Sequence, residues 1–504
     1  MNVMDLIGLD FKHRDLKAAA TRLALAGVTA NRDNLHDRLF DSVGIQRPKI
    51  EYTKLCRRIE DQDWWIKTLR REARQRREKL WLALDPTALK WVSSDGMKER
   101  DEILVAAEKW ADQTKFTATT DEGEEIIVNA PRQSEIDMHQ RAEMLTIAHG
   151  ITQMAGKDAK AYLCTVTAPS RFHPTRTIKK NDETKAQISN NKYDGSTPDC
   201  AQKWLQLHWA RARAKFKRLN IGQYWLMAVQ PHLDQTPHWH IVFFFPGGES
   251  EAEQVHEVLR QHFVFTERER GDEHRIDFEE MEGGSVGGIK YISRCIGYIS
   301  RAVMHGDDTE AIQEAMATIQ WASTWNIRRF RSSEVGKTAW RMARKKSVLS
   351  ENHPLAATAR ANDFAKFTQI RKESEAKILY LNVKNKYGET SKKVIGLTAN
   401  DVAFVNRLTW KKKSAAQVFA EKQIAEIEKR TVNIINRGRV ARCINLTDTP
   451  FILHSINPNP NTNPNTPVAL PPAPPPLAVG SGGGGKAPPP LPAMVNFGGR
   501  WHQG

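Results

Sequence analysis

The stretch 223-QYWLMAVQPHLDQTPHWHIVFFFPGG-248 predicts two β-strands joined by a turn. Apolar runs lie near both ends and turn-forming residues lie between them, so the two strands are expected to pair as an antiparallel hairpin. Because side chains alternate along a strand, His238 and His240 should share one face while Trp239 packs on the other. This arrangement places four polar side chains at one end of the hairpin: Gln230, His238, His240 and, in the turn, His232.

Strand-like and helical patterns alternate on both sides of this hairpin. Further segments predict one more strand at 160–168 and helices at 198–219 and 250–263. This order, with a hairpin in its middle, predicts an α+β fold in which helices pack on an antiparallel sheet.

Changes in composition divide the chain into four predicted regions. Residues 1–155 have a mostly helical pattern, including 55–84, whose arginine-rich face would either contact DNA or carry solvated charge. The predicted α+β region covers 156–348, and a basic helical pattern returns over 349–455. The tail at 456–504 is rich in proline, asparagine and glycine and is predicted to be disordered.

The charge balance indicates the class of partner. Lysine and arginine (75) exceed aspartate and glutamate (59), which gives a net charge of +16 and favours a polyanion such as nucleic acid over a membrane surface. The five cysteines form no C-x-x-C motif, so neither a disulfide framework nor a zinc ribbon is indicated. The chain starts without an apolar leader and has no long apolar run, so we expect a cytoplasmic protein without a membrane span.

Two imidazoles at strand spacing are a candidate metal site. Neutral imidazole is the commonest protein ligand for divalent transition metals, and His238 and His240 would point in the same direction. An ordinary pair of polar residues on a strand has the same pattern, so this motif alone leaves both interpretations open.

A second motif lies at 284-GSVGGIKYISRCIGYISRAV-303, where YISR occurs twice. On a helix, Tyr291 and Tyr298 would lie on one face nearly two turns apart, followed by Arg294 and Arg301 respectively. The tyrosines are either half-buried packing residues of an amphipathic helix or a pair of reactive phenols.

A third motif, 327-IRRFRSSEVGKTAWRMARKK-346, holds eight basic residues and one acidic residue. Basic groups neutralise phosphates, and aromatic rings such as Phe330 and Trp340 can stack on bases, so this segment predicts a surface that binds single-stranded nucleic acid. Its GKT triplet lacks the earlier glycine of a phosphate-binding loop, so we expect no ATPase or helicase domain in this chain.

The motifs occur in an order that resembles the replication gene A protein family of tailed bacteriophages and prophages, part of the HUH endonuclease superfamily. The pattern WW-x-x-x-LRR at 64–71 is also similar to the N-terminal region of that family. The blocks that carry the resemblance are 162-YLCTVTAPSRFHPT-175, 230-QPHLDQTPHWHIVFF-244, 283-GGSVGGIKYISR-294 and 320-QWASTWNIRRF-330 with 340-WRMARK-345.

The resemblance implies that 156–348 is an HUH endonuclease domain of a rolling-circle replication initiator. Such a protein nicks one strand at a phage replication origin in the bacterial host, remains on the 5′ end as a phosphotyrosine and later rejoins the strand. It implies Mg²⁺ or Mn²⁺ as cofactor, held by His238, His240 and Gln230, and the host replicative helicase and polymerase as partners. The residues expected to contact DNA are Lys290, Arg294, Arg301, Arg328, Arg329 and Arg331.

The sequence departs from the family in two places. The family usually has glutamate where this chain has Gln230, and its two tyrosines are usually four residues apart rather than seven. The nucleophile is therefore open between Tyr291 and Tyr298; we favour Tyr291, with Tyr298 as a second attacker or a packing residue. A plasmid relaxase or HUH transposase would share this chemistry, and a non-catalytic DNA-binding regulator would share only the basic surface.

Overall fold

The computed structural model describes residues 13–29, 33–84, 91–120, 122–180, 183–221, 224–265, 273–305, 309–334, 336–414, 416–421, 423–424 and 426–428. The described residues up to 412 belong to one compact unit, and those from 413 onward belong to a second. The predicted disordered tail, 456–504, lies outside the described residues, and the predicted domain boundaries inside the first unit stay predictions.

A five-stranded antiparallel sheet forms the centre of the first unit. Its strand order is β8-β3-β7-β6-β9, and every neighbouring pair is antiparallel. The predicted hairpin is confirmed, because β6 and β7 pair with Gln230 opposite His238. The bounds are β3 (Lys160–Thr167), β6 (Tyr224–Pro231), β7 (Pro237–Phe245), β8 (Ile276–Glu280) and β9 (Phe330–Ser332).

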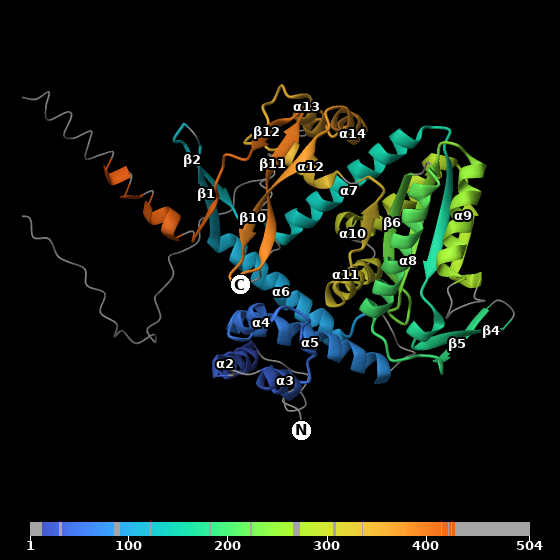
Figure 1. Cartoon of the computed structure of the whole chain (residues 1–504), viewed down its shortest axis with the longest axis horizontal. Helices are drawn as coiled ribbons and strands as arrows, with labels where there is room; N and C mark the ends of the chain where they lie inside the picture. Colours follow the sequence, from blue (N-terminus) through green and yellow to red (C-terminus); the bar gives the residue numbers. More distant parts are fainter. Residues whose placement is uncertain are drawn as a thin grey trace, which may run out of the picture. The chain divides into compact units, whose positions relative to one another are not determined.

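Helices cover both faces of this sheet, which confirms the predicted α+β class (Figure 1). On one face, α8 (Pro198–Arg218) and α9 (Glu249–Phe263) pack on a core that contains Trp239 and Phe243. On the other face, α7 (Gln133–Ala155) and α10 (Gly284–His305) pack on a core that contains Val242 and Phe244. The alternation of β7 side chains between these two cores fixes its register, since a slip by one residue would exchange the faces.

The N-terminal region is helical, as predicted, except for one hairpin. Its elements are α2 (His13–Thr29), α3 (Asp33–Ser42), α4 (Tyr52–Ile59), α5 (Gln62–Leu84), α6 (Ser94–Gln113), β1 (Thr114–Thr119) and β2 (Glu125–Asn129). The pattern over 55–84 forms two helices rather than one, and the second begins where the Asp61 carboxylate accepts a hydrogen bond from the backbone N–H of Asp63 (3.1 Å). A short acidic side chain in that position caps a helix N-terminus, which explains the interruption.

Downstream of 348 the prediction of a basic helical region is wrong in its central part. After α12 (Lys337–Ala343), α13 (Pro354–Arg360) and α14 (Phe364–Glu373), the chain forms an antiparallel sheet of β10 (Lys377–Lys384), β11 (Thr390–Ala399) and β12 (Val402–Val405). The physical reason is a hairpin turn at 385–389, in which Gly388 adopts φ 78°, a conformation that favours glycine. Exposed lysines obscure the alternation of polar and apolar residues along these strands, so the sequence did not show a strand pattern.

The remaining elements connect these parts. They are the short helices η1 (Ser170–Phe172) and η2 (Glu273–Arg275), the hairpin β4 (Thr175–Lys180) and β5 (Glu183–Ser189), helix α11 (Thr309–Thr324) and strand β13 (Lys411–Ser414). In the part of the chain that the structure describes, no helix combines the length and apolar character needed to cross a bilayer.

Candidate active site

His238 and His240 lie on the face of β7 that is covered by α10, and their rings converge. Their Nε2 atoms are 2.8 Å apart, and the Nδ1 of His240 is 3.3 Å from the hydroxyl of Thr165 on β3. Trp239 is fully buried on the opposite face, where its indole N–H donates to Gln202 (2.9 Å). Two cis ligands of an ion at ~2.1 Å are about 3.0 Å apart, so the spacing of the two nitrogens fits joint coordination.

The protonation state of the pair also fits a metal ligand. Burial lowers the pKa of His240 to about 4, and burial together with the neighbouring histidines lowers the pKa of His238 well below its usual value. Both rings are therefore neutral at pH 7, which leaves ring nitrogens available as donors.

These lowered pKa values predict how the stability of the metal-free protein changes with pH. His240 takes up its proton near pH 4 in the folded state, whereas the ordinary value is 6.5. Between these two values the unfolded chain binds more protons than the folded one. The contribution of His240 to the free energy of unfolding should therefore fall as pH decreases through this window and stay constant above it. Thermal unfolding in EDTA, compared between wild type and His240→Asn, measures this; the variant should lose less stability across the window, and an equal loss would contradict the assignment.

A third donor could come from the hairpin end. Gln230 lies opposite His238 across the β6–β7 pair, and its amide donates to the Cys295 sulfur at 3.8 Å. The ring of His232 lies against that of His238, with centroids 4.0 Å apart and the planes tilted by 34°, and its buried Nε2 has no hydrogen-bond partner. Within the described ranges, no three His, Cys, Asp or Glu side chains form a group that could hold a metal ion, so Gln230 is the stronger candidate for a third ligand and His232 the alternative.

A hydrogen-bonded histidine–aspartate pair beside this end was not predicted from the sequence. His173, after η1, places its Nδ1 2.9 Å from the carboxylate of Asp234 in the β6–β7 turn, and its ring is 5.3 Å from that of His232. Burial raises the pKa of Asp234, but hydrogen bonds with His173 and the Thr236 backbone, together with the electrostatic influence of His173 and His232, outweigh this and the net pKa shift is downward. The pair therefore holds the turn and orients His232; only the position of His173 within the first resemblance block pointed to it.

Tyr291 is the tyrosine that the structure places beside the histidine pair. Its ring centroid lies 6.0 Å from that of His240. Helix α10 approaches β7 closely because Gly288 has no side chain: a Cβ there would be 2.6 Å from Phe244 and 2.9 Å from Val242. Burial and the neighbouring Cys295 raise the pKa of Tyr291, so its phenol is protonated at neutral pH.

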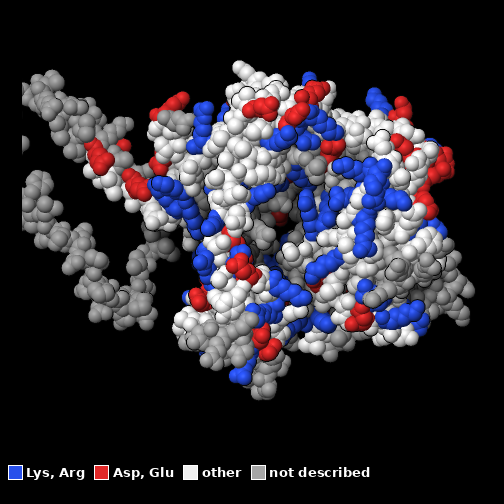
Figure 2. All heavy atoms as spheres, in the orientation of Figure 1, with Lys and Arg blue, Asp and Glu red and all other residues white. Residues whose placement is uncertain are grey.

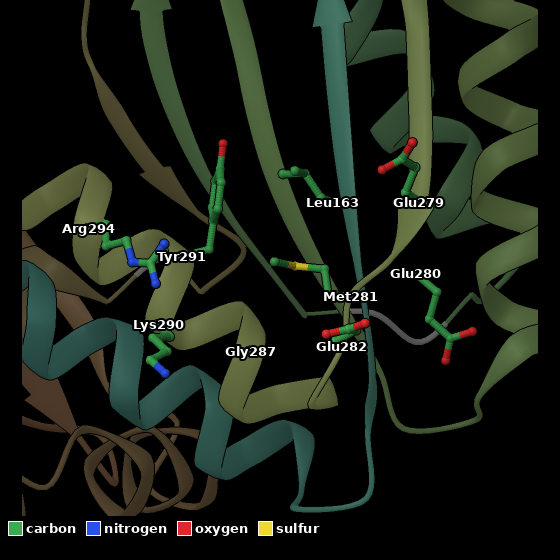
Figure 3. A pocket seen from close by; sticks show the side chains of 9 residues that line it. All are labelled: Leu163, Glu279, Glu280, Met281, Glu282, Gly287, Lys290, Tyr291 and Arg294. Carbon is green, nitrogen blue, oxygen red and sulfur yellow. The ribbon is translucent and has the colours of Figure 1, made fainter.

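A cavity of about 350 Å³ opens next to Tyr291 (Figure 3). Lys290 and Arg294 of α10 line it together with glutamates of β8 and the following turn, Glu279, Glu280 and Glu282. Figure 3 shows the Tyr291 hydroxyl and the Lys290 amine pointing in opposite directions, so this lysine does not assist the phenol directly. Tyr291 itself lines this cavity, so a ligand in the cavity would contact its side chain.

Comparison with known proteins adds the family. The sequence profile described as "Bacteriophage replication gene A protein (GPA)" matches residues 22–303, which is more than half of the chain. The chain belongs to this family. The match contains four of the five strands of the sheet, the histidine pair and both tyrosines, so the gene A protein family and the geometry point to the same part of the molecule.

Named relatives agree with this membership. The chain is similar to the "Replication gene A protein" of Escherichia phage P2 (32% identity; 38% of this chain, 26% of the relative) and to the "Probable replication protein P12" of Pseudoalteromonas phage PM2 (28% identity; 72% and 60%). It is also similar to a "Probable replication endonuclease from prophage-like region" of Salmonella paratyphi A (24% identity; 56% and 36%). The chain thus spans between about a quarter and three fifths of these relatives. No solved structure matches it.

The second tyrosine of this gene A family member is on the predicted helix, since α10 extends to His305. The side chains of Tyr298 and Arg301 lie outside the described residues. Their roles therefore stay predictions.

The basic residues predicted to contact DNA differ in their surroundings. Lys290, Arg294 and Arg328 are exposed, and Arg331 is half-buried near Arg328 and Arg213. Arg329 lies against the ring of Phe330 (5.0 Å), and burial lowers its pKa to about 10. It faces the region of Cys295 rather than the open surface, which makes it the least accessible of the predicted contacts whose side chains the structure describes.

The suggestion that Trp340 stacks on bases is wrong. Its side chain is buried between Phe364 and Phe367, with ring centroids 5.3 and 5.0 Å away. Helix α12 has one apolar face, which packs in the core, and its basic residues lie around that face. Trp340 is on the apolar face, so its role is packing.

Proposed function

We propose that this chain is a rolling-circle replication initiator that cuts one DNA strand at a replication origin and later rejoins it. The observation that supports this most directly is the position of Tyr291, 6.0 Å between ring centroids from His240 of the converging pair. A phenol beside a site for a divalent cation is what a tyrosine-dependent nuclease requires. Relatives named replication gene A protein and probable replication endonuclease support the same function.

In the proposed reaction, the Tyr291 phenol oxygen attacks a phosphodiester phosphorus and the bond from phosphorus to O3′ breaks. The phenol loses one proton and the departing O3′ gains one, so the reaction consumes neither water nor a nucleotide. A phosphotyrosine then holds the 5′ end, and the free 3′-OH can prime synthesis. Attack of a 3′-OH on the phosphotyrosine reverses these steps and rejoins the strand.

His238 and His240 are the residues that would hold a divalent cation, with Gln230 as the proposed third donor. When bound, Mg²⁺ or Mn²⁺ supplies positive charge that polarises the scissile phosphate. The neutral, buried imidazoles fit this role and match Mn²⁺ better than Mg²⁺, which prefers oxygen donors. Because the Tyr291 phenol keeps its proton in the free protein, its deprotonation belongs to the DNA-bound state.

Strand cleavage with single-stranded oligonucleotides tests this function. The oligonucleotides should tile the genome segment that carries this gene, and the reaction should be run with Mn²⁺, with Mg²⁺ and with EDTA. We expect cleavage at one site, a downstream fragment that is linked to the protein through its 5′ end, and complete loss of cleavage in EDTA. Cleavage that persists in EDTA, or DNA binding without cleavage across the whole segment, would contradict the proposal and favour a non-catalytic regulator.

The third metal donor can be assigned by comparing two variants. Gln230→Ala should raise the Mn²⁺ concentration needed for half-maximal cleavage, because it removes one neutral donor but leaves both imidazoles in place. His232→Ala should change this concentration less if His232 only packs on His238. A larger effect from His232→Ala than from Gln230→Ala would identify His232 as the ligand.

The proposed partners are origin DNA, single-stranded at the nick, and the replication enzymes of the host. The sequence has no complete phosphate-binding loop, so unwinding of the duplex is assigned to the host replicative helicase and extension of the 3′ end to the host polymerase.

A further inference from the structure

The β10–β11 hairpin reaches the N-terminal helices at its tip. Arg58 of α4 forms two hydrogen bonds with the carboxylate of Glu389, both 2.7 Å. Lys386 pairs with Asp61 at 2.5 Å, and the Tyr387 hydroxyl donates to the same carboxylate. We call these contacts the latch.

The latch completes a closed ring of packed elements. From α4 the contacts run through α5, α11, α10 and α7 to α14, and from there through α13 and α12 to β10 and β11. A hydrogen bond from Gln75 of α5 to the backbone of Thr324 of α11 (3.0 Å) strengthens the opposite side of the ring. Figure 2 shows a hollow at the centre of this face, which in the orientation of Figure 1 lies between the β10–β11 hairpin, α6, α7 and the helices α10 and α11.

The ring and the hollow are basic. Figure 2 shows Lys and Arg side chains gathered around the hollow, with few acidic ones among them. Residues 377–399, which form the hairpin, contain five lysines and one carboxylate, Glu389, which the latch uses. This charge would repel another basic surface and attract a polyphosphate.

One aromatic ring on the hairpin is placed to stack on bases. Tyr380 on β10 is 49% exposed, and the amine of Lys392 on β11 lies 5.9 Å from its ring centroid. An exposed aromatic ring flanked by lysines is the combination by which proteins bind single strands without reading their sequence. Double-stranded DNA does not expose the faces of its bases, so the surface fits a single strand.

The latch is built to open. Its contacts are polar: two ion pairs, the Tyr387 hydrogen bond to Asp61, and Arg58 stacked over the Tyr387 ring at 4.6 Å. The side chains of Arg58 and Glu389 are 22% and 26% exposed. Ion pairs that are partly open to solvent contribute little to stability, far less than an apolar interface of the same size. The hairpin can therefore leave α4 without unfolding either part.

We propose that the ring encloses a single DNA strand, and that the latch opens to admit the strand and then closes behind it. This proposal rests on the proposed function, because such a ring would keep the initiator on the displaced strand during a round of replication. An enclosed strand can leave a closed ring only by sliding off an end. Retention should therefore depend on whether the DNA has ends.

Retention on circular and linear DNA of the same sequence tests the ring. The protein is bound to a circular single-stranded phage-type DNA in EDTA, which prevents cleavage, and then challenged with an excess of unlabelled single-stranded oligonucleotide, which captures protein that has left the circle without screening the ion pairs of the latch. Wild-type protein should leave the circle about tenfold more slowly than the linear strand, equivalent to ~1.4 kcal/mol. Equal rates from both DNAs would overturn the proposal.

Charge-reversal variants test whether the latch is responsible for retention on circular DNA. Arg58→Glu and Glu389→Arg should each abolish the difference between circle and line, and the double variant, which restores an ion pair with reversed polarity, should recover it. Arg47→Glu, which breaks the surface pair with Asp37 (2.9 Å) in the same helical region, is the matched control and should behave as wild type. Single variants that retain the circle as wild type does would overturn the role of the latch.

Oligonucleotide cleavage with Mn²⁺, measured on the same preparations, separates the two proposals. Loss of retention with intact cleavage is the expected behaviour of the single variants. Wild-type protein that cleaves but shows no preference for circles overturns the ring and leaves the proposed function standing, whereas topological retention without cleavage overturns the proposed function alone.

Discussion

Tyr291→Phe is expected to abolish the covalent DNA adduct and to lower strand cleavage by a factor on the order of 10³ or more, because the phenol oxygen is the proposed nucleophile. The ring of Tyr291 lies beside His240, and phenylalanine preserves its packing against the core between α10 and the sheet. DNA binding should change little, since it depends on many phosphate contacts. Trapping the adduct with a single-stranded origin oligonucleotide and mapping the modified peptide by mass spectrometry measures the effect.

Tyr298→Phe is the matched variant on the same helix. It should keep the adduct on Tyr291 in a single round of cleavage and lose activity only where a second phenol is needed, as in termination. On a helix, residues four apart are about 6 Å apart along the axis and residues seven apart about 10.5 Å, so two phenols with the wider spacing are harder to place at one site. An adduct that persists on Tyr298 in Tyr291→Phe would overturn the assignment.

The second large effect is expected from the histidine pair. His238→Ala and His240→Ala should each reduce metal-dependent cleavage to background, because each removes one of the two nitrogens that lie 2.8 Å apart. Binding to a single-stranded oligonucleotide, measured by fluorescence anisotropy in EDTA, should remain within a few fold of wild type, since roughly the same phosphate contacts persist.

His274→Ala is the control for this pair, because His274 is an exposed histidine near the edge of the same sheet. It should cleave as wild type does. If either His238→Ala or His240→Ala cleaved at the wild-type rate, the metal site would have to be placed elsewhere.

Short-range patterns allowed much of the α+β core to be predicted. The alternation around His238 and His240 specified which side chains share a face, and the hydrophobic runs specified the strands on either side of the turn. The order of the motifs also indicated the family that the comparison then identified. These features follow from side-chain periodicity, which the backbone imposes locally.

Sequence patterns led to wrong predictions in two segments that are rich in basic residues. Trp340 lies in a basic stretch, but its ring completes a core, and the lysine-rich strands β10 and β11 had the composition of a solvated helix. In both cases the deciding contacts come from residues distant in sequence, such as Phe364 and Phe367 around the tryptophan ring.

By itself the sequence determined the converging histidines, the tyrosine helix and the basic character of the chain, because strand and helix periodicity act within a few residues. Only the tertiary structure decided that Tyr291 lies beside His240, that His173 pairs with Asp234, and that the tip of a distant hairpin meets α4. Each of these contacts joins segments whose separation along the chain carries no periodic signal. They form because burying the two faces of one sheet brings the helices and loops that cover it to fixed positions.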